Sequence, residues 1–223
     1  MKGALFTPDN IRATAEKRKT QTRRLDGLKE INQEPDKWMS TGVKYDSGKI
    51  EFYSIQQSDT LDFALIKPRY KIGEKAYIKE AHYRYGTWVK NGFSKSGRQK
   101  WTFEAMSATP VKYYDDPPEY EGKSLVLPNT KRETIGWYLR SPLFLPANLA
   151  RYFIKITGLL PQRLQDITEG DIIAEGIETG LTKIGYYYAF GQLWNSINKT
   201  YPYESNPWVW AYKYELVNRQ QYK

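Results

Sequence analysis

The sequence predicts a mixed α+β fold, in which a small mixed β-barrel carries short flanking helices and insertions of loops and hairpins. Segments typical of strands and of helices interleave without the regular strand–helix–strand repeat of a doubly wound sheet. The strongest strand pattern covers residues 208–217, where aromatic residues alternate with smaller or charged ones. Two stretches, about residues 26–66 and 86–135, contain several Gly and Pro residues, which favours insertions built of loops and hairpins.

The length and composition limit the organisation of the chain. At 223 residues it is long for one domain and short for two, so we expect a single domain, residues 1–223, that contains both insertions. The absence of cysteine excludes disulfides and thiolate metal sites, and it predicts a reducing, cytoplasmic location. No apolar run approaches the roughly 20 residues that a membrane helix needs, so we expect no membrane partner. Nothing in the sequence indicates the oligomeric state.

The chain is basic and rich in aromatic residues. It has 34 Lys and Arg against 25 Asp and Glu, a net charge of +9 that attracts polyanions. It also has 19 Tyr and 7 Trp. Cations that contact phosphates and aromatic rings that stack on bases are the usual means of binding single-stranded nucleic acid. The same aromatic residues could instead fill the core, so composition alone leaves both interpretations open.

The first predicted element is a short helix near the N-terminus. Thr7 stands at the capping position and Pro8 at the first helical position, and the helix is expected to run to about Arg18. Residues 19–25 then form either an extended segment or a tight turn into a strand.

The middle of the chain is predicted to be mainly strands and turns. Residues 43–52 have the pattern of a small hairpin, and residues 70–74 form a turn that leads into a strand over residues 75–85. After the second insertion, residues 141–151 contain two prolines and a short helical turn, and residues 152–164 form a strand.

The C-terminal part combines two helices with the last strand. Thr168 and Asp171 have the spacing of a capping box at the start of a short helix. Residues 186–197 form a second helix with an inward stripe at helical spacing, made of Phe190, Leu193, Trp194 and Ile197. On the last strand we expect the aromatic face to be the buried one, that is Trp208, Trp210, Tyr212 and Tyr214.

Four segments in the same order resemble the ASCH family, in the larger form often encoded by bacteriophages. They are Arg-Lys-Thr-Gln-Thr-Arg-Arg at residues 18–24, and Tyr-Lys-Ile-Gly-Glu with Ile-Lys-Glu within residues 70–80. The third is Leu-Gln-Asp-Ile-Thr-Glu at 164–169 leading to Ala-Glu-Gly-Ile at 174–177, and the fourth is Phe-Gly-Gln-Leu-Trp-Asn-Ser-Ile-Asn at 190–198 closing with Asn-Pro-Trp-Val-Trp at 206–210. Together they frame nearly the whole chain apart from the two insertions. The resemblance implies a PUA-like mixed β-barrel with a cleft between the barrel and the helices.

The resemblance also implies two kinds of function. Some small ASCH proteins are amidohydrolases that remove the acetyl group from N4-acetylcytidine, and others are described as nucleases or RNA binders. In the amidohydrolases a Lys, a Thr and a Glu act together, and their positions correspond to Lys19, Thr22 and Glu175 of this chain. The implied partner is RNA or a modified nucleoside, with no cofactor and no metal.

The chain departs from the family pattern at two places. Small members have Gly directly before Arg-Lys-Thr, where this chain has Lys17, and that Gly is expected to end the helix in a left-handed conformation. The larger form has Arg-Glu-Thr-Trp near the strand where this chain has Lys79-Glu80-Ala81-His82-Tyr83, so no role of that Arg or Thr applies here.

The three implied residues can be assigned chemical roles from their side chains. A lysine acts as a base when burial or nearby positive charge lowers its pKa, and Lys19 could then take a proton from Thr22 or from water. Thr22 would attack the substrate or orient its carbonyl group. Glu175 could pair with Lys19, hold the attacking water or protonate the leaving amine. Without the resemblance, the spacing alone favours the alternative that residues 17–24 form a solvated basic loop.

Three arginines beside these residues are candidates for phosphate or nucleic-acid binding: Arg18, Arg23 and Arg24. The alternative is that they are ordinary surface cations. His82 is the only histidine and has no second ligand at metal-binding spacing, so we interpret it as structural. The sequence lacks the phosphate-loop, dinucleotide-binding, zincin and nucleophile-elbow motifs. The enzyme hypothesis is therefore an amidohydrolase on acylated nucleosides or a ribonuclease, and the alternative is a non-catalytic RNA- or nucleotide-binding module.

Overall fold

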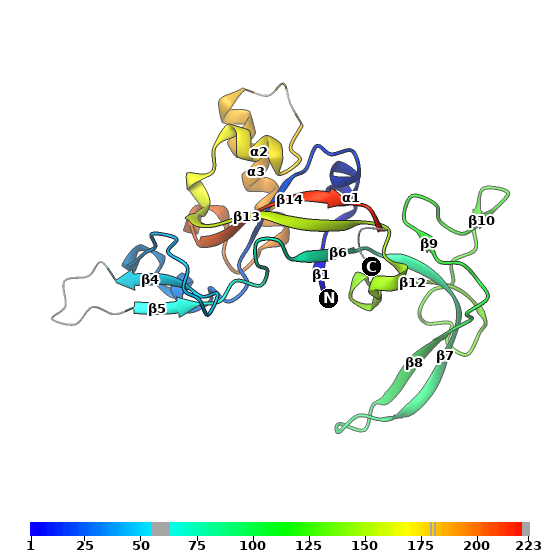
Figure 1. Cartoon of the computed structure of the whole chain (residues 1–223). Helices are drawn as coiled ribbons and strands as arrows, with labels where there is room; N and C mark the ends of the chain where they lie inside the picture. Colours follow the sequence, from blue (N-terminus) through cyan, green and yellow to red (C-terminus); the bar gives the residue numbers. More distant parts are fainter. Residues whose placement is uncertain (55–62, 179, 181, 220–223) are drawn as a thin grey trace. The chain divides into compact units, whose positions relative to one another are not determined.

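The computed structural model of the chain describes residues 1–54, 63–178, 180 and 182–219 (Figure 1). The chain divides into two compact units: unit 1 is Met1–Ile11 with Tyr77–Arg151, and unit 2 is Arg12–Ala76 with Tyr152–Lys223. The sequence predicted one domain with two insertions. The insertion at 86–135 lies in unit 1 and the insertion at 26–66 in unit 2, where residues 55–62 lie outside the described residues.

The described residues are mainly in strands, with few helices. The helices are α1 (Pro8–Ala15), α2 (Glu169–Ala174) and α3 (Lys183–Ile197). The strands are β1 (Lys2–Leu5), β2 (Gln21–Arg24), β3 (Trp38–Met39), β4 (Ile50–Ser54), β5 (Phe63–Ile66), β6 (Lys75–Lys79), β7 (His82–Phe93), β8 (Gln99–Ala105), β9 (Lys112–Tyr113), β10 (Glu119–Tyr120), β11 (Lys123–Ser124), β12 (Gly136–Arg140), β13 (Phe153–Arg163) and β14 (Trp208–Val217). The short 3-10 turns are η1 (Ile31–Gln33), η2 (Pro35–Lys37), η3 (Pro142–Phe144), η4 (Ala147–Leu149), η5 (Leu164–Asp166) and η6 (Tyr203–Ser205).

The centre of unit 2 is an antiparallel sheet in which β14 pairs with β13 on one side and with β2 on the other (Figure 1). The predicted strand at 152–164 is confirmed as β13, which has a bulge between Ile156 and Gly158. The predicted turn at 70–74 lies beside it, because the Gly73 amide donates to the Ile156 carbonyl over 2.7 Å.

Strand β14 is buried on the face that the sequence predicted. Its aromatic residues are all buried: Trp208, Trp210, Tyr212 and Tyr214. On the opposite face Val209 and Ala211 are also buried, whereas Lys213 and Glu215 are exposed. The first half of the strand is therefore covered on both faces, and the alternation of buried and exposed residues begins only in its second half.

A hydrophobic cluster fills the side of this sheet that Val209 faces. It consists of Leu164, Ile167, Ile172, Tyr186, Phe190, Trp194 and Val209. The capping box at the start of α2 is confirmed, with Thr168 Oγ1 accepting from the Asp171 amide over 3.2 Å. The inward stripe of α3 is confirmed for Phe190 and Trp194, but Ile197 is 48% exposed because the cluster does not extend to this last residue of the helix.

Unit 2 also contains a small sheet from the first insertion, in which β4 pairs with β3 and β5. The predicted hairpin at 43–52 is present as a turn, closed by the Tyr45 amide donating to the Lys49 carbonyl over 3.0 Å and by a bridge between Lys44 and Ile50. The stretch therefore turns where the sequence predicted, and its second arm continues into the sheet.

Unit 1 is built around the long strand β7, which pairs with β8, β9 and β12. The separate hairpin β10–β11 also lies within residues 86–135, where the sequence predicted loops and hairpins. The single strand predicted over residues 75–85 is wrong, because it breaks at Glu80 and Ala81 into β6 and β7. At the break, the Glu80 carboxylate is buried and forms a bidentate ion pair with Arg151, at 3.0 and 2.6 Å.

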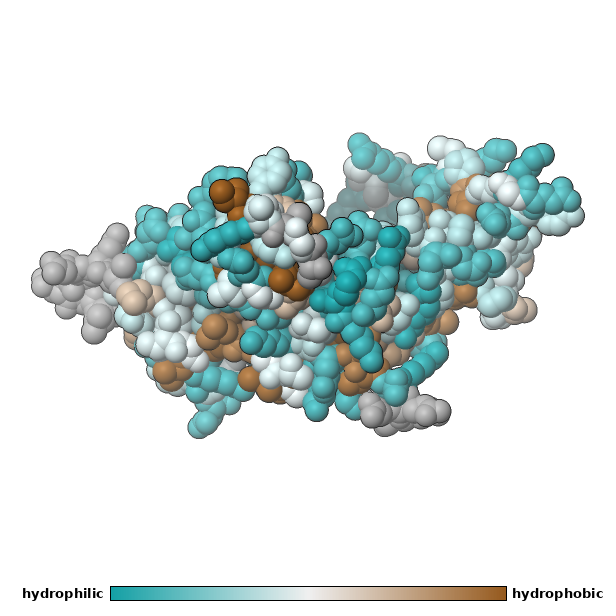
Figure 2. All heavy atoms as spheres, turned by 90° about the horizontal axis from the view of Figure 1, so that it is seen from above, coloured by the Kyte–Doolittle hydropathy of each residue, from teal (hydrophilic) through white to brown (hydrophobic). Residues whose placement is uncertain are grey.

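The described strands of each unit form open sheets, and none of these sheets closes into a barrel. The structure therefore confirms the mixed α+β class, while the barrel stays a prediction. Within the described ranges, no helix has both the length and the apolar character needed to cross a membrane. Hydrophilic residues cover most of the face shown in Figure 2, where hydrophobic residues form small separate patches.

The end of α1 forms a Schellman motif with a lysine where glycine is usual. The Arg18 amide donates to the Ala13 carbonyl over 2.8 Å and the Lys17 amide to the Thr14 carbonyl over 3.0 Å. Lys17 has a φ of 62°, in the left-handed region, so the helix ends at Ala15 rather than at the predicted Arg18. Lys17 thus adopts the conformation expected of the family's glycine at this position.

The first prediction follows from this turn. A side chain in the left-handed region costs roughly 1–2 kcal/mol, part of which is offset by the greater freedom of glycine in the unfolded chain. Replacing Lys17→Gly should therefore raise the free energy of unfolding by about 0.5–1 kcal/mol, measured by urea denaturation. The matched change Lys17→Ala, which keeps a Cβ, should not stabilise the protein. Equal stabilisation by both variants would contradict this account of the turn.

The second prediction concerns His82, which is buried, as expected of a structural residue. Burial lowers the pKa of His82 to about 4, although a hydrogen bond with the Glu80 carbonyl opposes the shift. An unfolded histidine titrates near pH 6.5, so between these values only the unfolded chain takes up the proton. The free energy of unfolding should therefore fall as the pH decreases from about 6.5 to about 4. His82→Asn, which does not titrate, should lose less stability over this range in urea denaturation, and equal losses would contradict the prediction.

Candidate active site

The candidate site begins where the chain leaves the turn after α1. The Lys19 amide donates to the Ala13 carbonyl over 3.0 Å, and the Thr20 amide donates to the Ala174 carbonyl at the end of α2 over 2.8 Å. These backbone hydrogen bonds join the two helix ends within unit 2. They hold Lys19 beside Glu175, although 156 positions separate the two residues in sequence.

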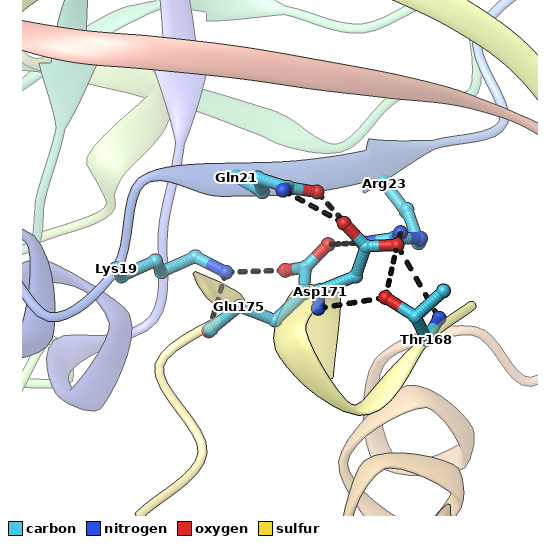
Figure 3. Close-up of polar contacts among 6 residues, drawn as sticks. All are labelled: Lys19, Gln21, Arg23, Thr168, Asp171 and Glu175. Atoms are coloured by element: carbon cyan, nitrogen blue, oxygen red, sulfur yellow. Dashed lines mark hydrogen bonds and ion pairs between the residues drawn. The ribbon is translucent and has the colours of Figure 1, made fainter. Parts of the chain in front are cut away.

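Glu175 is the C-terminal capping residue of α2, and its carboxylate meets the Lys19 amine. The Lys19 Nζ donates to Glu175 Oε2 over 2.5 Å and to the Glu175 carbonyl over 2.8 Å (Figure 3). A carboxylate at the C-terminus of a helix is disfavoured by the helix dipole, so a cation at this position stabilises it. Two of the three residues implied by the resemblance are therefore in direct contact.

Arg23 and Asp171 extend this pair into a network of four charged side chains. Arg23 Nη1 donates to Glu175 Oε1 over 3.0 Å, and its Nη2 lies 3.4 Å from Asp171 Oδ2. Gln21 Nε2 donates to Asp171 Oδ1 over 2.9 Å, so alternate residues of β2 reach α2 (Figure 3). Because two cations face two carboxylates, the network is neutral overall.

Burial determines the electrostatics of the network. The side chains of Lys19, Arg23 and Glu175 are 2%, 1% and 6% exposed. Burial lowers the pKa of Lys19, the ion pair with Glu175 opposes this shift, and the charges of Arg24 and Arg23 add to it. The net effect is that the pKa of Lys19 lies below its ordinary value. This is the condition under which Lys19 could act as a base.

A cavity of about 260 Å³ lies beside Lys19 within unit 2. Its lining consists of Thr14, Lys17, Lys19, Thr20, Tyr214, Glu215 and Leu216. Tyr214 Oη and Thr14 Oγ1 are hydrogen-bonded over 3.0 Å, and burial raises the pKa of the Tyr214 phenol. The cavity therefore offers neutral hydroxyl groups in the same lining as Lys19.

Thr22 lies on the opposite face of β2 from the side chains that reach α2. It is buried and is paired in register with Tyr212, so it shares a sheet face with Tyr212 and Tyr214. Tyr214 lines the cavity beside Lys19, but Thr22 is not among the lining residues. The structure thus joins Lys19 and Glu175 directly, and the role of Thr22 stays a prediction.

The three arginines predicted to bind phosphate have different environments. Arg18 is exposed and pairs with Glu16 over 2.5 Å. Arg23 belongs to the buried network rather than to an exposed basic surface. Arg24 is half-buried and lies opposite Trp210 in the register of the sheet.

Two members of the network were not predicted as site residues. Asp171 was interpreted only as part of the capping box, and Gln21 was given no role. Asp171 and Glu175 are four positions apart, which on a helix places them on one face, and this spacing is a signal that could have connected them. No group of three or more His, Cys, Asp or Glu side chains that could hold a metal ion occurs in the described part of the chain.

Comparison of the chain with family models, with curated proteins and with solved structures gives no match.

The third prediction tests the energetic importance of the network. Replacing Glu175→Gln leaves the Lys19 and Arg23 cations buried without their shared carboxylate, and breaking a buried ion pair in this way costs about 3–5 kcal/mol. The free energy of unfolding should fall by that amount in urea denaturation. The control is Glu16→Gln, which removes an ion pair whose side chains are about half exposed and should cost at most about 1 kcal/mol. Similar small effects of both changes would show that the network is not a structural constraint.

Proposed function

We propose that the chain is an ASCH protein with a PUA-like fold, and that it hydrolyses the acyl–amide bond of modified nucleosides. The observation that carries the proposal is the buried pair of Lys19 and Glu175, of which Lys19 lines a cavity, since nothing local in the sequence brings these residues together. The left-handed conformation of Lys17 supports the family assignment, because it is the conformation expected of the family's glycine.

The pair of Lys19 and Glu175 can supply both proton transfers that amide hydrolysis requires. The neutral amine of Lys19 takes the proton from the attacking hydroxyl group, which belongs to water or to Thr22. If Thr22 attacks, the acyl group passes to its oxygen, and a water deprotonated by Lys19 then releases it as the carboxylic acid. The proton can then pass across the 2.5 Å contact to Glu175, which delivers it to the leaving nitrogen. Burial favours this exchange, because it disfavours keeping both groups charged.

A specific observation favours a second function, a non-catalytic module that binds RNA or a nucleotide. The Lys19 amine already donates two hydrogen bonds to Glu175, one to the carboxylate and one to the carbonyl. A lysine held in this way fixes the end of α2 to the start of β2 without taking part in a reaction. In that case the cavity would bind its ligand without changing it.

The fourth prediction separates the two functions. Wild-type protein incubated with a panel of N-acylated nucleosides should release the free nucleoside, measured by chromatography. Lys19→Arg keeps a cation for Glu175 but removes the base, because arginine does not lose its proton, so the rate should fall by about 10²-fold or more. The matched control is Lys199→Arg, at an exposed residue of unit 2 that does not line the cavity, and it should keep the wild-type rate.

A second pair of variants tests the nucleophile. If Thr22 attacks, Thr22→Ala should lower the rate by a similar factor, whereas Thr200→Ala, at an exposed residue that does not line the cavity, should not. Full activity of Thr22→Ala would assign the attack to water and leave the roles of Lys19 and Glu175 intact. Failure of the wild-type protein to cleave any acylated nucleoside would overturn the hydrolase proposal and leave the binding module.

A further inference from the structure

One face of the sheet in unit 1 collects cations and aromatic rings. Directly paired residues share a face, and the register pairs Arg84 with Tyr138 and Trp88 with Phe103. Residues two apart along a strand also share a face, so Arg84 and Trp88 of β7 lie on the same side as Arg140 of β12. All these residues belong to the same compact unit.

The cations on this face lie over the aromatic rings. The Arg140 guanidinium carbon is 4.5 Å from the ring centre of Trp88, 4.4 Å from that of Phe103 and 5.0 Å from that of Phe144. Farther along the face, Arg132, which precedes β12, lies 4.8 Å from the ring centre of Trp101 on β8. Guanidinium groups close to aromatic rings form a surface on which further planar groups can stack.

The charge of the two central arginines is not compensated. In the part of the chain that the structure describes, neither Arg84 nor Arg140 forms an ion pair with a carboxylate. Burial lowers the pKa of Arg140, and the neighbouring charge of Arg84 lowers it further. At the far end of the face, Lys90 does pair with Glu133, over 3.0 Å and with both side chains exposed.

Two donors on this face also lack acceptors. Arg84 Nε and Trp88 Nε1 are inaccessible to solvent, and neither has a hydrogen-bond partner among the described residues. A buried donor without an acceptor costs about 1–3 kcal/mol, so native proteins rarely leave one unless it has another role. Uncompensated cations together with unused donors are the features of a site that binds an anion.

We propose that this face of unit 1 binds a single strand of nucleic acid, with a phosphate held by Arg84 and Arg140 and bases stacked on Phe144 and Trp101. The cations supply the charge complementarity to a phosphodiester backbone. Phe144 is 64% exposed, and a base can therefore stack on it without rearrangement. A duplex fits this face poorly, because its bases are stacked on one another and their faces are not available to Phe144 or Trp101. This site is separate from the Lys19–Glu175 pair and does not depend on the hydrolase proposal.

The test is fluorescence anisotropy with labelled single-stranded RNA and DNA of about 12 nucleotides, and with a duplex of the same sequence, over a range of salt concentrations. The wild-type protein should bind the single strands in preference to the duplex, with an affinity that falls as salt rises. Arg140→Gln and Phe144→Ala should each weaken binding about tenfold. Arg140→Gln should also reduce the salt dependence by about one released counterion, whereas Phe144→Ala should not change it.

Matched controls are available on the same elements. Leu143 is 59% exposed beside Phe144, and Arg98 is exposed at the end of the β7–β8 hairpin. Leu143→Ala and Arg98→Gln should bind like the wild type, as should Lys19→Arg. Thermal unfolding of each variant shows whether it is folded, and Phe144→Ala, which truncates an exposed side chain, keeps the test available if Arg140→Gln is unstable.

Absence of single-strand binding at low salt would overturn the proposal. So would equal binding of single strands and duplex with no effect of Phe144→Ala, because this result indicates a general attraction for polyanions. Loss of binding in Lys19→Arg with full binding in Arg140→Gln and Phe144→Ala would move the nucleic-acid site to the cavity in unit 2.

Discussion

The buried ion network around Glu175 is the constraint on which the arrangement of unit 2 depends. Lys19, Arg23, Asp171 and Glu175 come from the turn after α1, from β2 and from α2, and each pairing is made inside the protein. Removing such charges from water costs several kcal/mol each, which only close opposite charges can offset. The helix end, the edge strand β2 and the last turn of α2 must therefore keep one arrangement. Helix α2 also contributes Ile172 to the hydrophobic cluster that contains Val209 of β14.

Much of the fold could be predicted from the sequence wherever a local pattern determines it. The alternation along 208–217 predicted a strand and its buried face, and the Thr168–Asp171 spacing predicted a capped helix. The strand predicted over residues 75–85 is interrupted at Glu80 and Ala81. The sequence pattern does not reveal this break, because Glu80 binds Arg151, which is 71 positions away. The partition into two compact units also depends on contacts between distant segments, which periodicity does not encode.

The candidate site was predictable only in part, and for the same reason. Neither periodicity nor spacing connects Lys19 with Glu175, and only the family resemblance indicated that the two act together. Arg23 illustrates the limit, because a run of arginines after a helix is typical of phosphate binding. Strand alternation on β2 instead turns this side chain toward Glu175, where a carboxylate neutralises it. A basic motif predicts charge, but the face on which each cation lies determines whether that charge is available to a ligand.

The same distinction separates five of the chain's arginines into two groups. Arg23, Arg151 and Arg163 each contact a carboxylate, and each fixes one segment against another. Arg84 and Arg140 are half-buried, Arg140 lies over three aromatic rings, and neither has a carboxylate partner among the described residues. The three arginines that fix one segment against another each have a carboxylate, and the pair in unit 1 differs from them in this respect. The anionic ligand proposed for this face would supply the missing negative charge, and the aromatic rings beside Arg140 favour a ligand that also has planar groups.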